Sequence, residues 1–419
     1  MAEMEEDDRW SHLPNDLSTM IAKRLHNRLD NLRLRSVCSS WRSAIPPFKQ
    51  NPFPLHVPFY FPSHLSIHPE GRAHYAFFQS TIYFLQPPME QNPKPNVPNS
   101  TPWLLRVEEI ENGKMHPLNP LSKISTDHVP KAFPTVLNLL NFRITEIGQT
   151  YNLQFVDLNN KKIETKWEES VIQTKKVVVS SNPWTTDGVD YEVMAIQRTK
   201  LWFLKLGDEK WSDIRAPEPG RSCHYNDCVY HKGKFFAVND RGSTVVIGSD
   251  LRAEEIVPPI RMNKRIASMR GGISVKYRYL VSSWGDLFLV TKCTGSYEKF
   301  VYDKRDMPLH FKVYKLNEEK KEWGRVETLG DRVFFVGDNC SYCVSTWDFA
   351  GLKGDCIYFC DNLFTNYNDE DKNLTEICGD SGVYSLADDS CRPLARFSDH
   401  SQIFWPPQAW FKPKPPRIE

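Results

Sequence analysis

The residues of this chain best suited to chemistry are closely spaced cysteines and histidines. Cys223, His224, Cys228 and His231 lie in one short run, and zinc sites use such soft ligands at close spacing. Successive side chains of a strand point to opposite faces, so Cys228 would share a face with Tyr230 while His231 would point the other way. The spacing therefore argues against a shared metal ion.

Two further cysteine pairs are Cys340 with Cys343 and Cys356 with Cys360. Cysteines in a strand-rich protein without a secretory signal are usually small buried hydrophobic residues. Nucleophilic cysteine chemistry needs a site that stabilises the thiolate, and the neighbouring residues suggest none. We therefore expect no catalytic cysteine, no metal and no cofactor.

Sequence patterns of other catalytic sites are also missing. No stretch matches the phosphate-binding patterns G-x-x-x-x-G-K-[ST] and G-x-G-x-x-G, or the zinc-protease pattern H-E-x-x-H. The run Gly379–Gly382 lacks the fifth position of the G-x-S-x-G nucleophile motif. The acidic cluster Asp369–Asp371 is typical of a solvated loop. The sequence therefore predicts a protein that is not an enzyme.

Short β-strands are expected to carry most of these residues. The clearest hairpin is Asp227–Ile247, where two β-rich runs flank a turn at Asn239–Gly242. A similar unit at Ala73–Leu85 would turn at Gln79–Thr81. Further units of strand, turn and strand are expected at Trp103–Leu118, Tyr191–Ile214, Tyr279–Val290 and Phe311–Val326, the third with its turn at Trp284–Asp286. Single short strands are expected at Arg332–Val336, Cys356–Cys360 and Gly382–Leu386.

These units recur roughly every 40–50 residues, which is the length of a four-stranded propeller blade. Residues 73–413 would then form about seven blades. A pair of stacked β-sandwich domains is the alternative, and the absence of a linker in the middle of this region argues against it. The predicted fold class is a small all-α domain followed by an all-β propeller.

The composition limits the kinds of partner. The 419 residues include 53 basic and 52 acidic side chains, so the net charge of +1 argues against a nucleic-acid partner for the whole molecule. No run approaches the roughly 18 apolar residues that span a bilayer. The polar, acidic start of the chain is no signal or transit peptide. We therefore expect no membrane partner and a location in the nucleus or cytoplasm.

The N-terminal stretch predicts short helices with an apolar stripe. Leu13, Leu17, Ile21 and Leu25 recur at a four-residue step on one side of a helix, which Pro14 can begin. A second apolar series contains Leu29, Leu32, Leu34, Val37, Cys38 and Trp41. So small a domain buries little surface, and we expect part of its apolar set to dock onto another protein.

Two alternatives exist for this stretch. The helices could form a plain bundle packed on the rest of the chain. From Lys23 to Arg42 there are six basic residues and one acidic residue, Asp30, and such a run could meet phosphates. No aromatic stacking platform or groove-reading motif accompanies these charges, so we expect no nucleic acid.

The stretch resembles the F-box motif. The matching residues are Leu13-Pro14, Asp16-Leu17, Ile21, Leu25, Leu32, Arg35, Val37-Cys38 and Trp41-Arg42. The resemblance implies docking onto the Skp-family adaptor of a cullin-RING ubiquitin ligase. Its implied adaptor-binding residues are Leu13, Pro14, Leu17, Ile21, Leu25, Leu32, Val37, Cys38 and Trp41, of which the last three would also hold the helices together.

The rest of the chain resembles the plant KIB-type domain. The matching stretches are Trp103-Leu104, Leu118–Ser122, Val229–Val238, Phe311–Leu316 with Trp323, Leu329–Phe335 and Trp410–Pro413. Pro102 and Ser122 depart from the usual glycine and threonine. The resemblance covers most of residues 73–413 and implies a kelch-like propeller beside an F-box in a flowering plant.

Together these observations predict five segments. An acidic disordered tail at 1–8 precedes an F-box domain at 9–48, a proline- and aromatic-rich connector at 49–72, a propeller at 73–413 and a tail at 414–419. The resemblance implies a non-catalytic substrate-recognition adaptor of an SCF-type (Skp–cullin–F-box) E3 ubiquitin ligase, with an unknown target protein. The alternatives are a binding module without ubiquitin transfer and a propeller receptor for a small molecule.

Overall fold

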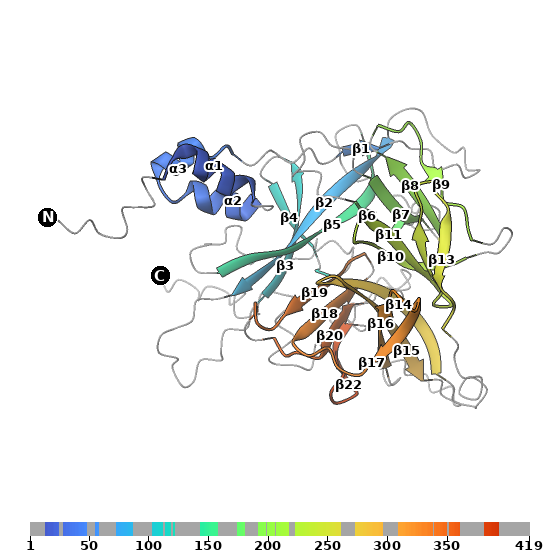
Figure 1. The fold of residues 1–419 in the computed structure, drawn as a ribbon. Helices are drawn as coiled ribbons and strands as arrows, with labels where there is room; N and C mark the ends of the chain where they lie inside the picture. Colours follow the sequence, from blue (N-terminus) through green and yellow to red (C-terminus); the bar gives the residue numbers. More distant parts are fainter. Residues whose placement is uncertain are drawn as a thin grey trace, which may run out of the picture.

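A computed structural model of the chain describes residues 13–24, 28–47, 55–57, 73–86, 103–111, 114–118, 120–121, 143–157, 174–180, 192–197, 199–205, 207–217, 223–260, 273–295, 309–337, 339–349, 352–360 and 381–393. Three helices come first: α1 (Asn15–Lys23), α2 (Arg28–Arg35) and α3 (Ser39–Ala44). They lie to one side of a body built from strands (Figure 1). None of the helices in these ranges is long and apolar enough to cross a membrane.

The strands fall into five groups, which we call units 1 to 5. Unit 1 contains β1 (Leu55–Val57), β2 (Ala73–Gln86), β3 (Trp103–Glu111), β4 (Lys114–Leu118) and β5 (Arg143–Asp157), in the order β4-β3-β2-β5 with β1 on β2. Unit 2 contains β6 (Thr174–Val179), β7 (Glu192–Gln197), β8 (Lys200–Lys205) and β9 (Ser212–Asp213). A single pair, Tyr151 with Val177, joins units 1 and 2 into one sheet.

The remaining units are separate antiparallel or mixed sheets. Unit 3 contains β10 (Tyr225–His231), β11 (Lys234–Asn239), β12 (Thr244–Ile247) and β13 (Ala253–Val257). Unit 4 contains β14 (Ile273–Ser283), β15 (Asp286–Gly295), β16 (Leu309–Asn317) and β17 (Glu322–Val326). Unit 5 contains β18 (Arg332–Gly337), β19 (Ser341–Ser345), β20 (Cys356–Cys360), β21 (Ser381–Ser385) and β22 (Ser390–Pro393), with β18 and β20 parallel.

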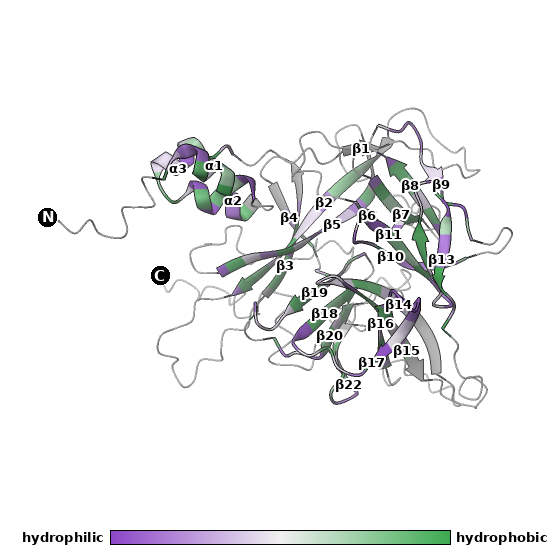
Figure 2. Ribbon diagram, in the orientation of Figure 1, coloured by the Kyte–Doolittle hydropathy of each residue, from purple (hydrophilic) through white to green (hydrophobic). Residues whose placement is uncertain are grey.

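Buried hydrophobic clusters lie between consecutive units. Hydrophobic residues concentrate on the strands of the body, such as β11 and β14 (Figure 2). Side chains of neighbouring units share a cluster in each case, among them Phe77 with Trp202, Ile196 with Phe235, Val238 with Leu289 and Phe288 with Phe334. Consecutive units therefore pack against each other along the whole series from unit 1 to unit 5.

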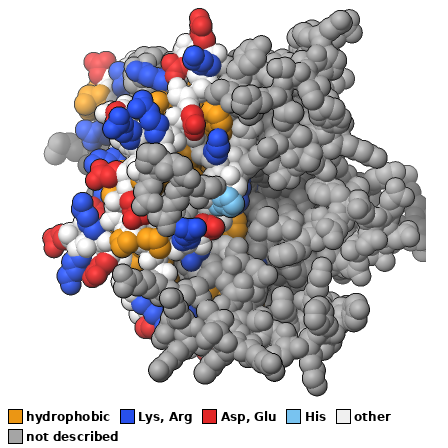
Figure 3. Space-filling model, turned by 90° about the vertical axis from the view of Figure 1, so that its right-hand side faces the viewer, with side chains coloured by type: hydrophobic (Ala, Val, Ile, Leu, Met, Phe, Trp, Pro, Cys, Tyr) orange, Lys and Arg blue, Asp and Glu red, His pale blue; other side chains and the backbone are white. Residues whose placement is uncertain are grey.

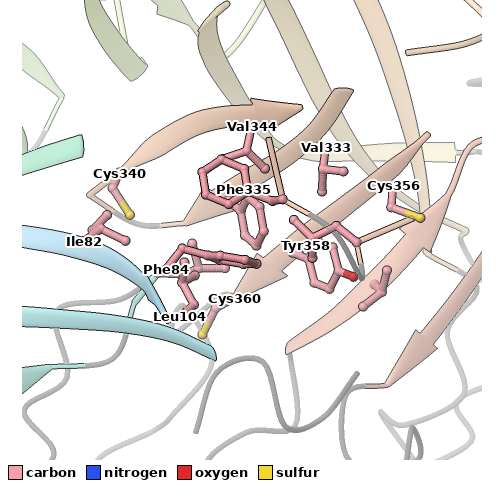
Figure 4. Close-up of a cluster of buried hydrophobic side chains, with 14 residues drawn as sticks. Ile82, Phe84, Leu104, Val333, Phe335, Cys340, Val344, Cys356, Tyr358 and Cys360 are labelled. Carbon is pink, nitrogen blue, oxygen red and sulfur yellow. The ribbon is translucent and has the colours of Figure 1, made fainter. Parts of the chain in front are cut away.

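The first and last units also pack together. Ile82, Phe84 and Leu104 of unit 1 share a buried cluster with Phe335 and Tyr358 of unit 5 (Figure 4). This contact closes the series of five units into a ring, which is the arrangement of a propeller.

Backbone and polar contacts also join unit 1 to unit 5. The guanidinium Nη1 of Arg106 donates to Asn339 Oδ1 at 3.0 Å, and Cys340 Sγ donates to the carbonyl oxygen of Pro120 at 3.3 Å. Gly337 lies so close to unit 1 that a Cβ atom there would be 1.9 Å from the carbonyl oxygen of Leu121. Only glycine allows the two backbones to approach this closely.

A buried ion pair connects the other four units. Lys176 Nζ of β6 lies 2.5 Å from Asp227 Oδ1 of β10, and both side chains are more than nine-tenths buried. The backbone N–H of Leu280 on β14 donates to Asp227 Oδ2 at 2.7 Å, and Ser341 Oγ on β19 donates to the same oxygen at 3.4 Å. One carboxylate thus makes polar contacts to units 2, 4 and 5 from unit 3.

The structure contains one hairpin that the sequence predicts and lacks one predicted turn. The hairpin at Asp227–Ile247 is present as β10, β11 and β12. The turn at Gln79–Thr81 is wrong, because β2 runs through it: Ser80 is buried, pairs with Thr150 and accepts a hydrogen bond from Arg106. A polar residue can lie inside a strand when it has hydrogen-bond partners, so the polarity of Ser80 does not indicate a turn.

The predicted count of about seven blades is not confirmed. The described strands form five units, whose first long strands begin at residues 73, 174, 225, 273 and 332. The expected repeat of roughly 40–50 residues fits the spacing between the first strands of units 2, 3 and 4. Unit 1 occupies a far longer stretch of the chain.

The domain boundaries remain predictions. The connector at 49–72 contains β1, which pairs with β2. The tails at 1–8 and 414–419 and the stretch Trp410–Pro413 lie outside the described residues.

Candidate protein-binding surface on the N-terminal helices

Local sequence explains how α1 begins and how it meets α3. Pro14 precedes the helix, where its missing N–H removes no hydrogen bond, and its carbonyl oxygen accepts from the N–H of Ser18 at 3.1 Å. Asp16 lies in the first turn, where the helix dipole favours a carboxylate. The hydroxyl of Thr19 donates to the carbonyl oxygen of Ala44 at 3.2 Å and so links α1 to α3.

A small core holds the three helices together. Ala22, Trp41 and Ile45 are buried, and Leu13, Leu34 and Cys38 pack against them partly buried. Cys38 also precedes α3, where its Sγ accepts a hydrogen bond from the N–H of Trp41 at 3.4 Å. The bundle therefore has its own interior, although a very small one.

The same helices carry an unusual amount of exposed hydrophobic surface. Leu17, Met20, Ile21, Leu32 and Val37 are each between 38% and 55% exposed. Among the residues that the structure describes, the other large hydrophobic side chains with comparable exposure are two tryptophans of the propeller. Clustered apolar exposure of this kind marks a site for a protein partner.

Three of these side chains form one face of α1. Leu17, Met20 and Ile21 are separated by three and four residues, so they lie side by side on the helix surface. We call them the α1 apolar face. Ser18 and Ala22, on another side of the helix, are buried in the bundle. The helix therefore packs one side on the bundle and presents an apolar side to the outside.

The structure places the nine predicted adaptor-binding residues in three settings. Exposed to solvent are Pro14, Leu17, Ile21, Leu32 and Val37; partly buried are Leu13 and Cys38; buried is Trp41. Leu25 lies outside the described residues. The sequence reasoning missed Met20, although its spacing of three residues from Leu17 was a usable signal.

Helix α2 anchors the bundle to the propeller. Leu29 packs against Leu85 and Ile144 of unit 1, and the guanidinium of Arg33 donates to the carbonyl oxygen of Ile144. Arg33 also forms an ion pair with Asp30 at 2.9 Å. The bundle thus meets the propeller through α2, and the α1 apolar face stays exposed.

A carboxyl group beside this contact has a shifted pKa. Burial raises the pKa of Glu146, a hydrogen bond from Gln149 opposes the shift, and the nearby Asp30 carboxylate adds to it. The smallest of these contributions, from Asp30, reflects the proximity of α2 to β5.

Four of the described cysteines do not resemble nucleophiles. Burial raises the pKa of Cys228 far above the ordinary value, and it raises the pKa of Cys343, Cys356 and Cys391 to about 11 in each case. These thiols are protonated at neutral pH, and a thiolate is the reactive form. The Nδ1 atom of the His231 ring lies 2.8 Å from Ser282 Oγ.

The structure also bears on the closely spaced cysteines and histidines, whose sequence spacing argues against a shared zinc ion. Within the described ranges, no group of three or more histidine, cysteine, aspartate or glutamate side chains could hold a metal ion.

Comparisons with known proteins agree with this architecture. Residues 72–385 match the KIB1-4 beta-propeller family. The chain is 28% identical to F-box protein SKIP23 of Arabidopsis thaliana, over 96% of this chain and 95% of that protein. It is 29% identical to putative F-box protein At5g60060 of the same plant, over 84% of this chain and 88% of that protein. F-box protein At2g17036, also from Arabidopsis, is 26% identical over 96% of this chain and 94% of that protein.

The family match covers most of the chain, and two of these relatives extend over the N-terminal helices as well. A propeller therefore replaces the alternative of two stacked β-sandwiches. The chain belongs to the KIB1-4 β-propeller family and is a plant F-box protein with its propeller after the N-terminal helices.

Proposed function

We propose that this protein is the substrate-recognition adaptor of an SCF-type E3 ubiquitin ligase. The observation that carries the proposal is the α1 apolar face, left exposed on helices that follow the F-box pattern. The F-box names of the relatives support the same role. In this role α1 docks onto a Skp-family adaptor, and through it the chain joins a cullin-RING ligase.

The physical basis of docking is burial of apolar area. Removing apolar surface from water stabilises a complex by roughly 25 cal/mol per Å². Exposed leucine, isoleucine and methionine side chains provide apolar surface that carries no polar group to be stripped of water. An amphipathic helix laid into an apolar groove is a common solution. Leu32 and Val37 extend the apolar surface beyond α1.

The propeller would hold the target protein, and the chain itself would break no bond. A target held beside a loaded ubiquitin-conjugating enzyme reacts as if highly concentrated. The described part of one face carries basic and acidic side chains interspersed, with hydrophobic side chains in small patches (Figure 3). Together with the net charge of +1, this supports a protein partner rather than nucleic acid.

The proposal includes a location and leaves two alternatives. We place the protein in the nucleus or cytoplasm, where its ten cysteines would remain reduced. A binding module without ubiquitin transfer would use the same α1 apolar face. A small-molecule receptor would instead use polar groups near the middle of the propeller, where Lys176 and Asp227 are already committed to each other.

Reconstitution separates these roles. We expect the purified chain to form a stable complex with a purified plant Skp adaptor, and we expect cullin to join only when the adaptor is present. Size-exclusion chromatography with each component omitted in turn measures this. Adaptor binding without cullin would favour the module that does not transfer ubiquitin, and absence of any adaptor complex would overturn the proposal.

A further inference from the structure

Turns at one end of units 3, 4 and 5 lie together. The β14–β15 turn contains Trp284 and Gly285, and Arg332 at the start of β18 donates from Nε to Ser283 Oγ at 3.2 Å. The β10–β11 turn joins them, because Lys232 of that turn forms an ion pair with Glu318 of the β16–β17 turn at 2.7 Å. We call this end the Trp284 surface; it comprises Lys232, Trp284, Asp286, Glu318, Arg332 and Trp347.

Trp284 occupies a backbone conformation that does not suit it. Its φ is +43°, and Gly285 follows with a φ of +83° in a two-residue hairpin turn. Such turns favour Asn-Gly, and a bulky side chain at positive φ is an outlier. Trp284 is also 59% exposed, so burial in the fold does not account for its presence. A large apolar side chain exposed in such a turn points to a binding role.

The second exposed tryptophan is tied to the first through Arg332. The guanidinium carbon of Arg332 lies 5.4 Å from the centre of the Trp284 ring. Arg332 pairs with Ser345 across β18 and β19, and the N–H of Trp347 donates to Ser345 Oγ at 3.1 Å. Trp347 is 87% exposed. Tryptophan and arginine together are typical of the residues that dominate binding energy at protein interfaces.

The charges of this surface are matched among themselves. Lys232 pairs with Glu318, and Asp286 accepts from Lys315 at 2.8 Å and lies 3.5 Å from Arg332 Nη2. Within this surface Lys232 and Arg332 balance Asp286 and Glu318, and Lys315 beside it adds one positive charge. A highly charged partner would compete with these pairs for little electrostatic gain. The complementary partner is therefore an uncharged segment with apolar side chains.

We propose that the Trp284 surface binds an uncharged peptide segment of the ligase's target protein, through aliphatic or aromatic side chains that contact the two indoles. The inference rests on the proposed function, in which the propeller holds the target. Tight two-residue turns hold Trp284 in place before binding, which reduces the entropy lost when a partner docks.

Selection with random short peptides displayed on phage tests this surface on the full-length chain. We expect enriched peptides with aromatic or aliphatic residues and a net charge near zero. Fluorescence anisotropy of the strongest peptide should show at least tenfold weaker binding to Trp284→Asn and to Trp347→Ser, of the order of a hot-spot loss.

Leu251→Asn is the matched control. Leu251 has a φ of +57° in the turn between β12 and β13 and lies outside the Trp284 surface, so asparagine relieves a similar backbone conformation without changing a residue of that surface. This variant should bind the peptide like the unmodified chain. No enriched peptide, enrichment of highly charged peptides, or equal binding to the tryptophan variants would overturn the inference.

Binding to the Skp adaptor, measured in parallel, separates the two proposals. The tryptophan variants should bind the adaptor as the unmodified chain does. Failure of the unmodified chain to bind adaptor would sink the proposed ligase role, whereas peptide binding that ignores Trp284 and Trp347 would sink only the assignment of this surface.

Discussion

Replacing Leu17 and Ile21 together with alanine should weaken binding to a Skp-family adaptor by about 30- to 1000-fold. Each substitution removes an exposed aliphatic side chain of the α1 apolar face. Loss of the burial of two such side chains corresponds to about 2–4 kcal/mol. Surface plasmon resonance with immobilised adaptor measures the change directly.

The fold should survive this double substitution. Leu17 and Ile21 lie outside the small core of Ala22, Trp41 and Ile45, so the melting temperature should stay close to that of the unmodified chain. Ser43→Ala is a suitable control, because Ser43 is exposed and its hydroxyl bonds only within α3, to the Ser39 carbonyl oxygen at 3.0 Å. Undiminished adaptor binding by the double variant would remove the α1 apolar face from the interface.

Replacing Asp227 with alanine should lower the free energy of unfolding of the propeller by about 3–5 kcal/mol. The change leaves the buried ammonium of Lys176 without its carboxylate, and breaking a buried pair by removing one partner has about this effect. It also removes the acceptor of the Leu280 N–H at the centre of the ring. Thermal and denaturant unfolding followed by circular dichroism should both report the loss.

The exposed ion pair between Lys232 and Glu318 provides the comparison. Both side chains are more than half exposed, and such pairs contribute at most about 1 kcal/mol. Glu318→Ala should therefore change stability far less than Asp227→Ala. Equal effects of the two substitutions would mean that the central carboxylate does not hold the units together.

The sequence was most informative where structure is local. Pro14 and the apolar spacing predicted a helix that the structure begins at Asn15, and Pro46 follows the end of α3. The turn residues near Gly242 predicted the connection between β11 and β12. Residues that are neighbours in the chain determine such features, so a single sequence is enough to predict them.

Features that depend on distant contacts could not be predicted in the same way. The sequence puts Leu13 on the same helical stripe as Leu17, but Leu13 lies before α1, where Pro14 has an extended ψ of 138°, and it packs against the bundle core while Leu17 stays exposed. The parallel pairing of β18 with β20 and the packing of Phe84 against unit 5 join segments that no local pattern connects. Ser80 was mistaken for a turn residue because its partner, Arg106, lies on another strand.

The two exposed tryptophans show the same limit. The sequence marks Trp284 as a turn residue, but it does not reveal that Arg332 stacks on its ring or that Trp347 bonds to Ser345, the strand partner of Arg332. Exposure and backbone strain appear only when the turns of several units are assembled.

Hydrogen exchange with and without a purified Skp adaptor tests the central claim most directly. We predict slower amide exchange across α1 (Asn15–Lys23) and around Leu32 and Val37 once the adaptor binds, while the β14–β15 turn is unchanged. Bound adaptor with no added protection of α1, or with protection confined to the propeller, would contradict the account.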